Sequence, residues 1–143
     1  MYTSLMTELL GGKKTTGLEV RTPMDLVELS RKGVSKASLL YLAEYMGSPV
    51  GKMAVLLPVT ERTIQRYGRK DLFNRVVSES ILHVAEVVAR GVEIFEDKEI
   101  FLGWLRQPSE AMGGRTPVSL LNSRYGASMV LDELTRIEHG VVS

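Results

Sequence analysis

The chain of 143 residues contains no cysteine, only two histidines and no long hydrophobic run. The lack of cysteine excludes disulfides, thiolate zinc sites, iron–sulfur clusters and thiol catalysis within these residues, and it is typical of a reducing, intracellular compartment. The longest apolar stretch, Met53 to Val59, is seven residues long and contains a proline, so we expect no membrane span. The N-terminus lacks a basic region followed by an apolar one, so we expect no secretory signal.

Side chains that carry out catalysis are scarce and scattered. His83 and His139 lie 56 positions apart, no set of His, Asp and Glu has zinc-ligand spacing, and the serines have no partnered histidine nearby. Gly113 and Gly114 precede an expected helix start, a place that binds anions in some proteins, but the chain has no phosphate-loop motif. We therefore expect a protein that is not an enzyme and that binds no metal and no cofactor.

The apolar residues recur at intervals of three and four, and clear period-two strands are absent. Helix boundaries are marked as well. Hydroxyl caps precede prolines at Thr22-Pro23, Ser48-Pro49 and Thr116-Pro117, further caps are Ser35 and Thr60, and helices should stop at Gly33, Gly47 and Gly140. These patterns predict an all-α fold.

The net charge is only +1, but the charges are segregated along the chain. Residues 51–75 carry six bases and two acids, a local charge of +4, whereas residues 76–100 carry two bases and six acids, a local charge of −4. A near-neutral protein of this kind has one basic end that can meet a nucleic acid. Two unrelated solvated faces would give the same pattern, and charge alone does not separate these alternatives.

The basic segment contains a candidate helix-turn-helix. A first helix is predicted from Pro49 to about Leu57, where Pro58 ends it, and a second from Glu61 to about Tyr67. Ala54 is small enough for the two helices to cross closely, and Ile64 can face the core. The spacing recurs in many helical bundles, so a pair of packed helices with a basic exposed face is the alternative.

The outward side of the second helix carries groups that can read a major groove. Arginine pairs with guanine, glutamine with adenine, and threonine meets the methyl group of thymine. Basic residues after the helix can reach phosphates, which position a protein without specifying sequence. The DNA-binding candidates are Thr60, Arg62, Thr63, Gln65, Arg66, Arg69 and Lys70. Because one module makes few phosphate contacts, we expect a homodimer on double-stranded operator DNA.

The chain divides into three expected parts. Residues 1–21 include a basic, glycine-rich connector at 11–17 and are predicted to form a flexible N-terminal arm. Residues 22–70 form the helix-turn-helix domain. Residues 71–143 begin with a long helix, from about 71 to 96, whose apolar stripe is wide enough for an internal core and a subunit partner, so we expect this part to mediate dimerisation.

The second half resembles a known family in three sequence runs. In this order they resemble the C-terminal toxin-binding domain of Xre/MbcA/ParS-type antitoxins: Leu102-Gly-Trp-Leu-Arg-Gln-Pro108, Ala111-Met-Gly-Gly-Arg-Thr-Pro-Val-Ser-Leu-Leu121 and Asp132-Glu-Leu-Thr-Arg-Ile-Glu-His-Gly-Val-Val142. The segment from Ala54 to Arg66 resembles that family's Xre-like helix-turn-helix, and the likeness spans about residues 35 to 143. The chain departs from the family at Pro58, where glycine is usual, and at 139–142, where an aromatic is common.

The resemblance implies an antitoxin of a RES–Xre toxin–antitoxin system, with a helical toxin-binding domain after the helix-turn-helix. Its partner would be a cognate RES-domain toxin that depletes cellular NAD in the cytoplasm. Such an antitoxin inhibits the toxin by direct contact and represses its own operon. In the family the C-terminal tail blocks the toxin's active-site cleft. That role falls here on Arg136, Ile137, Glu138, His139, Gly140, Val141 and Val142.

Without the resemblance, the last residues would be interpreted as a frayed terminus. Two other functions also stay open. A stand-alone helix-turn-helix transcriptional repressor would bind its operator without a partner protein. A helical adaptor would bind no duplex even at low salt, where phosphate contacts are strongest.

Overall fold

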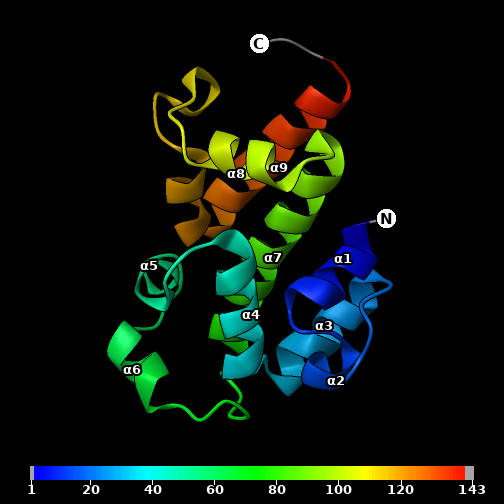
Figure 1. Ribbon diagram of the computed structural model, residues 1–143, viewed down its shortest axis with the longest axis vertical. Helices are drawn as coiled ribbons and strands as arrows, with labels where there is room; N and C mark the ends of the chain where they lie inside the picture. Colours follow the sequence, from blue (N-terminus) through cyan, green and yellow to red (C-terminus); the bar gives the residue numbers. More distant parts are fainter. Residues whose placement is uncertain (1, 141–143) are drawn as a thin grey trace.

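A computed structural model of the protein describes residues 2–140, and every regular element in this range is a helix (Figure 1). The all-α prediction is confirmed. The helices, in chain order, are α1 (Tyr2–Leu9), α2 (Lys13–Thr16), α3 (Pro23–Lys32), α4 (Lys36–Met46), α5 (Val50–Ala54), α6 (Glu61–Arg66), α7 (Arg75–Phe95), α8 (Lys98–Leu105), the short 3-10 helices η1 (Glu110–Met112) and η2 (Pro117–Asn122), and α9 (Arg124–Glu138).

Helix α7 is the axis around which the other helices are arranged. From the N-terminal half α1 and α3 pack against it, and from the C-terminal half α8 and α9 do so (Figure 1). Ten of its 21 residues are buried. A helix that is apolar on most of its faces has to be covered by other helices on those faces. Helix α7 is therefore part of the hydrophobic core of both halves of the chain.

The ends of α7 are set by local backbone chemistry. Asn74 caps its start, since the side-chain Oδ1 accepts a hydrogen bond from the N–H of Val77 at 2.9 Å. At its end Glu96 adopts a left-handed φ of 58°, and the N–H of Glu96 donates to the carbonyl of Val92 at 2.9 Å. The predicted long helix therefore exists, but residues 71–74 belong to the loop before it.

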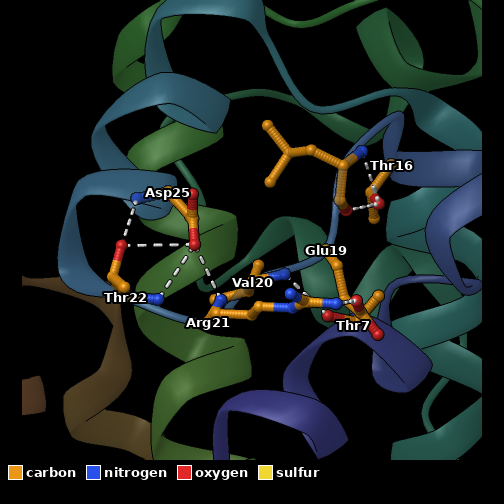
Figure 2. Close-up of polar contacts among 8 residues, drawn as sticks. Thr7, Thr16, Glu19, Val20, Arg21, Thr22 and Asp25 are labelled. Carbon is orange, nitrogen blue, oxygen red and sulfur yellow. Dashed lines mark hydrogen bonds and ion pairs between the residues drawn. The ribbon is translucent and has the colours of Figure 1, made fainter.

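The N-terminal residues pack into the core instead of forming the expected flexible arm. Met6, Leu9 and Leu10 are almost fully buried, and α1 lies against α7 and α4. The hydroxyl of Thr7 accepts a hydrogen bond from the N–H of Val20 at 2.9 Å, which fixes the chain that leads into α3 (Figure 2). The expectation was wrong for this segment because its apolar spacing of i, i+3 and i+4 belongs to a helix whose partner lies far along the chain.

Helix α3 begins with the capping residue that the sequence indicated. The hydroxyl of Thr22 accepts from the N–H of Asp25 at 3.4 Å, and the Asp25 carboxylate accepts from the N–H groups of Arg21 and Thr22 at 2.8 and 2.9 Å (Figure 2). These bonds, led by the one from Arg21, hold the pKa of Asp25 below its usual value.

The other predicted caps agree with the structure to different degrees. Ser35 caps α4 and Thr60 caps α6, as predicted. The Ser48-Pro49 cap is wrong by one position, because α5 begins at Val50 with Pro49 in the cap position. Thr116 caps as predicted, but the helix that follows it is η2, a 3-10 helix.

Helices α7 and α8 meet through a glycine. A side chain at position 91 would place its Cβ 2.0 Å from Cε1 of Phe101, so only a hydrogen leaves room for this ring. Phe101 is fully buried, with its ring centroid 5.7 Å from that of Phe95 and 6.1 Å from that of Trp104. This contact fixes the direction in which α8 leaves α7.

Replacing Gly91 with alanine should lower the free energy of unfolding by about 1–3 kcal/mol, since the added methyl group overpacks the contact with Phe101. Urea denaturation measures this difference. Gly103→Ala in α8 is the matched control, because nothing lies within 4 Å of a Cβ there. Alanine at this exposed helical position should stabilise by about 0.5–1 kcal/mol. Equal stability of the two variants would show that Phe101 moves aside without strain.

Candidate functional site

Helices α5 and α6 form a helix-turn-helix beside α4. Met53 and Ala54 of α5 and Ile64 of α6 are buried, so both helices pack their inner sides against the core. The first helix is shorter than predicted and ends at Ala54. The reason is that the N–H groups of Leu56 and Leu57 bond to carbonyls three residues back, which tightens the chain into turns.

The turn brings the start of α6 close to α5. A Cβ on Gly51 would lie 2.9 Å from Oε2 of Glu61, so the glycine makes this approach possible. Glu61 stands in the first turn of α6, where the helix dipole favours a carboxylate. The Oγ1 of Thr60 accepts a hydrogen bond from the N–H of Thr63 at 3.1 Å. The N-terminus of α6 is therefore held in one position.

The predicted DNA-contacting side chains of α6 share its outer face. Arg62, Gln65 and Arg66 are exposed at positions i, i+3 and i+4. Thr63 is half-buried, and its hydroxyl is engaged by that of Thr60 in a hydrogen bond of 2.9 Å. None of the ion pairs in the described part of the chain engages Arg62 or Arg66. Both guanidinium groups are open to an external anion.

The remaining DNA-binding candidates, Arg69 and Lys70, lie exposed in the loop 67–74 between α6 and α7. The start of α4 holds this loop, since the N–H of Ala37 donates to the carbonyl of Arg69 at 2.9 Å. The guanidinium carbon of Arg69 also lies 5.9 Å from the ring centroid of Tyr41. Sequence reasoning missed this anchoring, because pairing between irregular segments far apart in the chain leaves no local pattern.

The loop between α8 and α9 is a closed turn. The N–H of Ser109 donates to the carbonyl of Arg115 at 3.0 Å, and between them Gly113 and Gly114 adopt positive φ angles of 67° and 82°. The two glycines therefore provide the backbone conformation that this turn requires. After it, η2 approaches α9 so closely that a Cβ on Gly126 would lie 1.8 Å from a backbone oxygen of η2.

The structure places the first five of the seven tail candidates, whereas Val141 and Val142 lie outside the described residues. Ile137 is half-buried, and the exposed ones are Arg136, Glu138, His139 and Gly140. Nη1 of Arg136 lies 3.4 Å from Oε1 of Glu133, one turn earlier. Helix α9 ends at Glu138, and Gly140 adopts a left-handed φ of 71°, so the chain turns where it leaves the helix.

A bidentate ion pair ties the end of α9 to α7. Nη1 and Nη2 of Arg90 donate to the two carboxylate oxygens of Glu138 at 3.2 and 2.5 Å. Nη1 of Arg90 also lies 3.6 Å from Oε1 of Glu93. The hydrogen bond from Arg90 lowers the pKa of Glu138. Sequence reasoning missed Arg90, because its partner lies 48 positions away.

The pKa of Glu138 should lie below its ordinary value of 4.5, since Arg90 stabilises the charged form. A carboxylate with a lowered folded pKa stabilises the fold above its unfolded pKa, and this contribution disappears as the pH falls through the folded value. NMR titration of the carboxyl carbon measures the pKa. Arg90→Gln should return it toward 4.5, whereas Arg136→Gln should leave it low. An unchanged pKa in Arg90→Gln would contradict the ion pair.

The acidic residues after α7 act at a helix start. Oδ1 of Asp97 accepts a hydrogen bond from the N–H of Ile100 at 3.0 Å and caps α8. Within residues 2–140, no group of three or more His, Cys, Asp or Glu side chains is placed to hold a metal ion. The same residues include no helix with the length and apolar character needed to cross a bilayer.

The fold and its exposed surfaces define a class: a two-part helical protein, with a helix-turn-helix in the first part and a smaller helical unit in the second. Residues 25–86 match the family model of the antitoxin Xre-like helix-turn-helix domain. Residues 90–140 match the model of the antitoxin Xre/MbcA/ParS C-terminal toxin-binding domain. The chain therefore belongs to the Xre-type antitoxin family.

Curated relatives agree with the family. An antitoxin Xre from Photorhabdus laumondii is 32% identical over 93 residues, which span 62% of this chain and 63% of the relative, somewhat under two thirds of its length. An antitoxin Xre from Yersinia enterocolitica is 29% identical over 129 residues, or 89% of this chain and 87% of the relative. A Prs ADP-ribosylating antitoxin from a Sphingobium species is 25% identical over 129 residues, or 83% of this chain and 81% of the relative.

The two family matches meet within α7, between residues 86 and 90. Helices of both halves pack against α7, so it belongs physically to each of them. A domain border at residue 70, as the sequence suggested, remains a prediction.

Proposed function

We propose that this protein is an antitoxin that binds and neutralises a RES-type, NAD-depleting toxin and represses its own operon as a DNA-bound homodimer. One observation supports this above all others: a single chain joins an exposed cationic helix-turn-helix face to a part that matches a toxin-binding domain. In this function the protein is not an enzyme and acts in the cytoplasm beside its DNA. Its relatives carry the names of antitoxins.

In the DNA-binding role, α6 enters the major groove with Arg62, Gln65 and Arg66 toward the base edges. Arginine and glutamine are the side chains that pair bidentately with guanine and adenine. Arg69 and Lys70 stand on an anchored loop, from which they can hold phosphates and fix the register. With six residues, α6 is only about 9 Å long, so one copy reads few base pairs and a second copy is needed for a specific operator.

In the toxin-binding role, residues 136–142 block the partner's active-site cleft. The Arg90–Glu138 ion pair supports this assignment, because it fixes where the last turn of α9 ends. The left-handed φ of Gly140 ends the helical path at the last described residue, directly before the two valines of the tail. Val141 and Val142 supply apolar anchors of the kind that dominate small interfaces.

The name of one relative also supports a second class of partner. The Sphingobium relative is called a Prs ADP-ribosylating antitoxin, so an ADP-ribosylating toxin is the alternative to an NAD-depleting one. A stand-alone repressor is the remaining alternative function. It would bind its operator equally well with or without the product of the neighbouring gene.

Removing residues 140–143 should abolish neutralisation and leave promoter binding intact. This truncation keeps α9 and the Arg90–Glu138 pair whole, so the tail loses only the residues after His139. The measurement is growth during co-expression with the neighbouring open reading frame, with Arg21→Ala as a control far from the tail. Cellular NAD and ADP-ribosylated protein, measured in the same cultures, separate the two classes of toxin. Rescue by the truncated chain would contradict the role of the residues after His139, and failure of the full chain to co-purify with the neighbour would remove the antitoxin function.

Two substitutions should affect DNA binding in different ways. Arg66→Ala should weaken binding by about 1–3 kcal/mol and relax specificity at one base pair, since it removes a base contact. Lys70→Ala should weaken operator and random duplex alike and lower the salt slope by about 0.9 per protomer, since it removes a phosphate contact. Fluorescence anisotropy at several salt concentrations distinguishes the two effects. Unchanged affinity in both variants would show that α6 and its loop are not the interface.

A further inference from the structure

The N-terminal segment before α3 contains the pair Lys13-Lys14 on α2. Given the DNA-binding role proposed above, we infer that α2 extends this interface. In this inference the two lysines contact the phosphate backbone beside the site that α6 reads. The family match to the helix-turn-helix begins at residue 25 and does not include α2.

Helix α2 is fixed to the body of the protein and does not hang from it. The hydroxyl of Ser38, at the start of α4, donates to the carbonyl of Leu10 at 2.8 Å just before α2. Just after the lysines, Nζ of Lys32 donates to the carbonyl of Thr16 at 2.9 Å. Both ends of α2 are therefore held, and its two lysines project from a defined place.

One aromatic ring connects α2 to the loop that carries the phosphate-contacting candidates. A Cβ on Gly11 would lie 2.5 Å from Cδ2 of Tyr41, so the chain that enters α2 lies directly on this ring. The same ring has the guanidinium group of Arg69 5.9 Å from its centroid. Nζ of Lys36, the first residue of α4, donates to the carbonyl of Tyr67 at 2.8 Å. The loop 67–74 is therefore bonded to the helix that carries Tyr41.

These contacts gather cations at one end of the molecule. Figure 1 shows α2, the junction of α3 and α4, the loop 67–74 and α6 along the same lower edge. The cations on these segments outside α6 are Lys13, Lys14, Arg31, Lys32, Lys36, Arg69 and Lys70. The stretch 11–17 has no acid, and Asp71 is the acid of the loop 67–74, where its carboxylate accepts from the N–H of Gly68 at 2.7 Å.

A DNA backbone is the partner that fits this arrangement. The lysines are exposed, and no ion pair in the described part of the chain engages them. They continue the cationic edge that begins at α6 and passes through Arg69, and a duplex with its groove on α6 presents flanking phosphates along such an edge. Phosphate contacts of this kind add affinity and salt dependence but no sequence preference.

The test compares the full-length protein with the double variant Lys13→Ala/Lys14→Ala. The probes are a duplex that spans the promoter upstream of its own gene and a random duplex of equal length. Loss of two phosphate contacts lowers the slope of log affinity against log salt by about 1.8 per protomer, at about 0.9 per contact. We expect binding to weaken about tenfold or more at low salt, and to the same extent for both probes.

The control is Arg115→Ala/Arg124→Ala, which removes the same charge from exposed positions in the C-terminal half. Its salt slope should match that of the unaltered protein. Thermal unfolding of both variants shows whether the fold is intact, and alanine at 13 and 14 suits a helix.

An unchanged slope in Lys13→Ala/Lys14→Ala, with normal binding by the unaltered protein, would overturn the role of α2 and leave the helix-turn-helix function standing. An equal loss in the control would also overturn it, because the effect would then come from net charge. If the unaltered protein binds neither duplex at low salt, both the inference and the proposed DNA binding are wrong.

Discussion

The burial of α7 is the constraint on which the rest of the structure depends. Ile81, Val84, Ala85 and Val88 are completely removed from solvent, and helices from both halves of the chain contact α7. Neither half could cover so wide an apolar helix alone, so each contributes the surface that the other leaves open. The helix-turn-helix and the C-terminal unit therefore share one core and are held at fixed positions along one helix.

A buried hydroxyl group on α7 fixes how neighbouring segments are positioned against this apolar core. The Oγ of Ser78 on α7 accepts from the N–H of Val34 at 2.8 Å and donates to the carbonyl of Phe73 at 3.2 Å. It thereby joins the start of α4 and the loop before α7 to the same turn of the helix. A buried polar group that is fully paired specifies one arrangement, because any other arrangement would leave it without partners. The loop that carries Arg69 and Lys70 is positioned from this point.

Features with a local cause could be predicted from the sequence, and features set by distant contacts could not. The caps at Thr22, Ser35 and Thr60 depend on residues three positions away, and the inward face of Ile64 depends on helical periodicity. The burial of α1 depends on α7, some seventy positions along the chain, and the Arg90–Glu138 pair spans 48 positions. The sequence pattern within a single helix contains neither contact, so it predicts a flexible arm and gives no signal for Arg90.

The arrangement along α7 also limits how the two proposed roles can influence each other. Helix α6 lies near the N-terminal end of α7, whereas the Arg90–Glu138 pair and the end of α9 lie at its C-terminal end (Figure 1). With 21 residues, α7 is about 31 Å long, so the tail and the outer face of α6 are separate surfaces of one protomer. Since two recognition helices have to match two half-sites, a bound toxin that changes the distance between the two copies would also change DNA affinity.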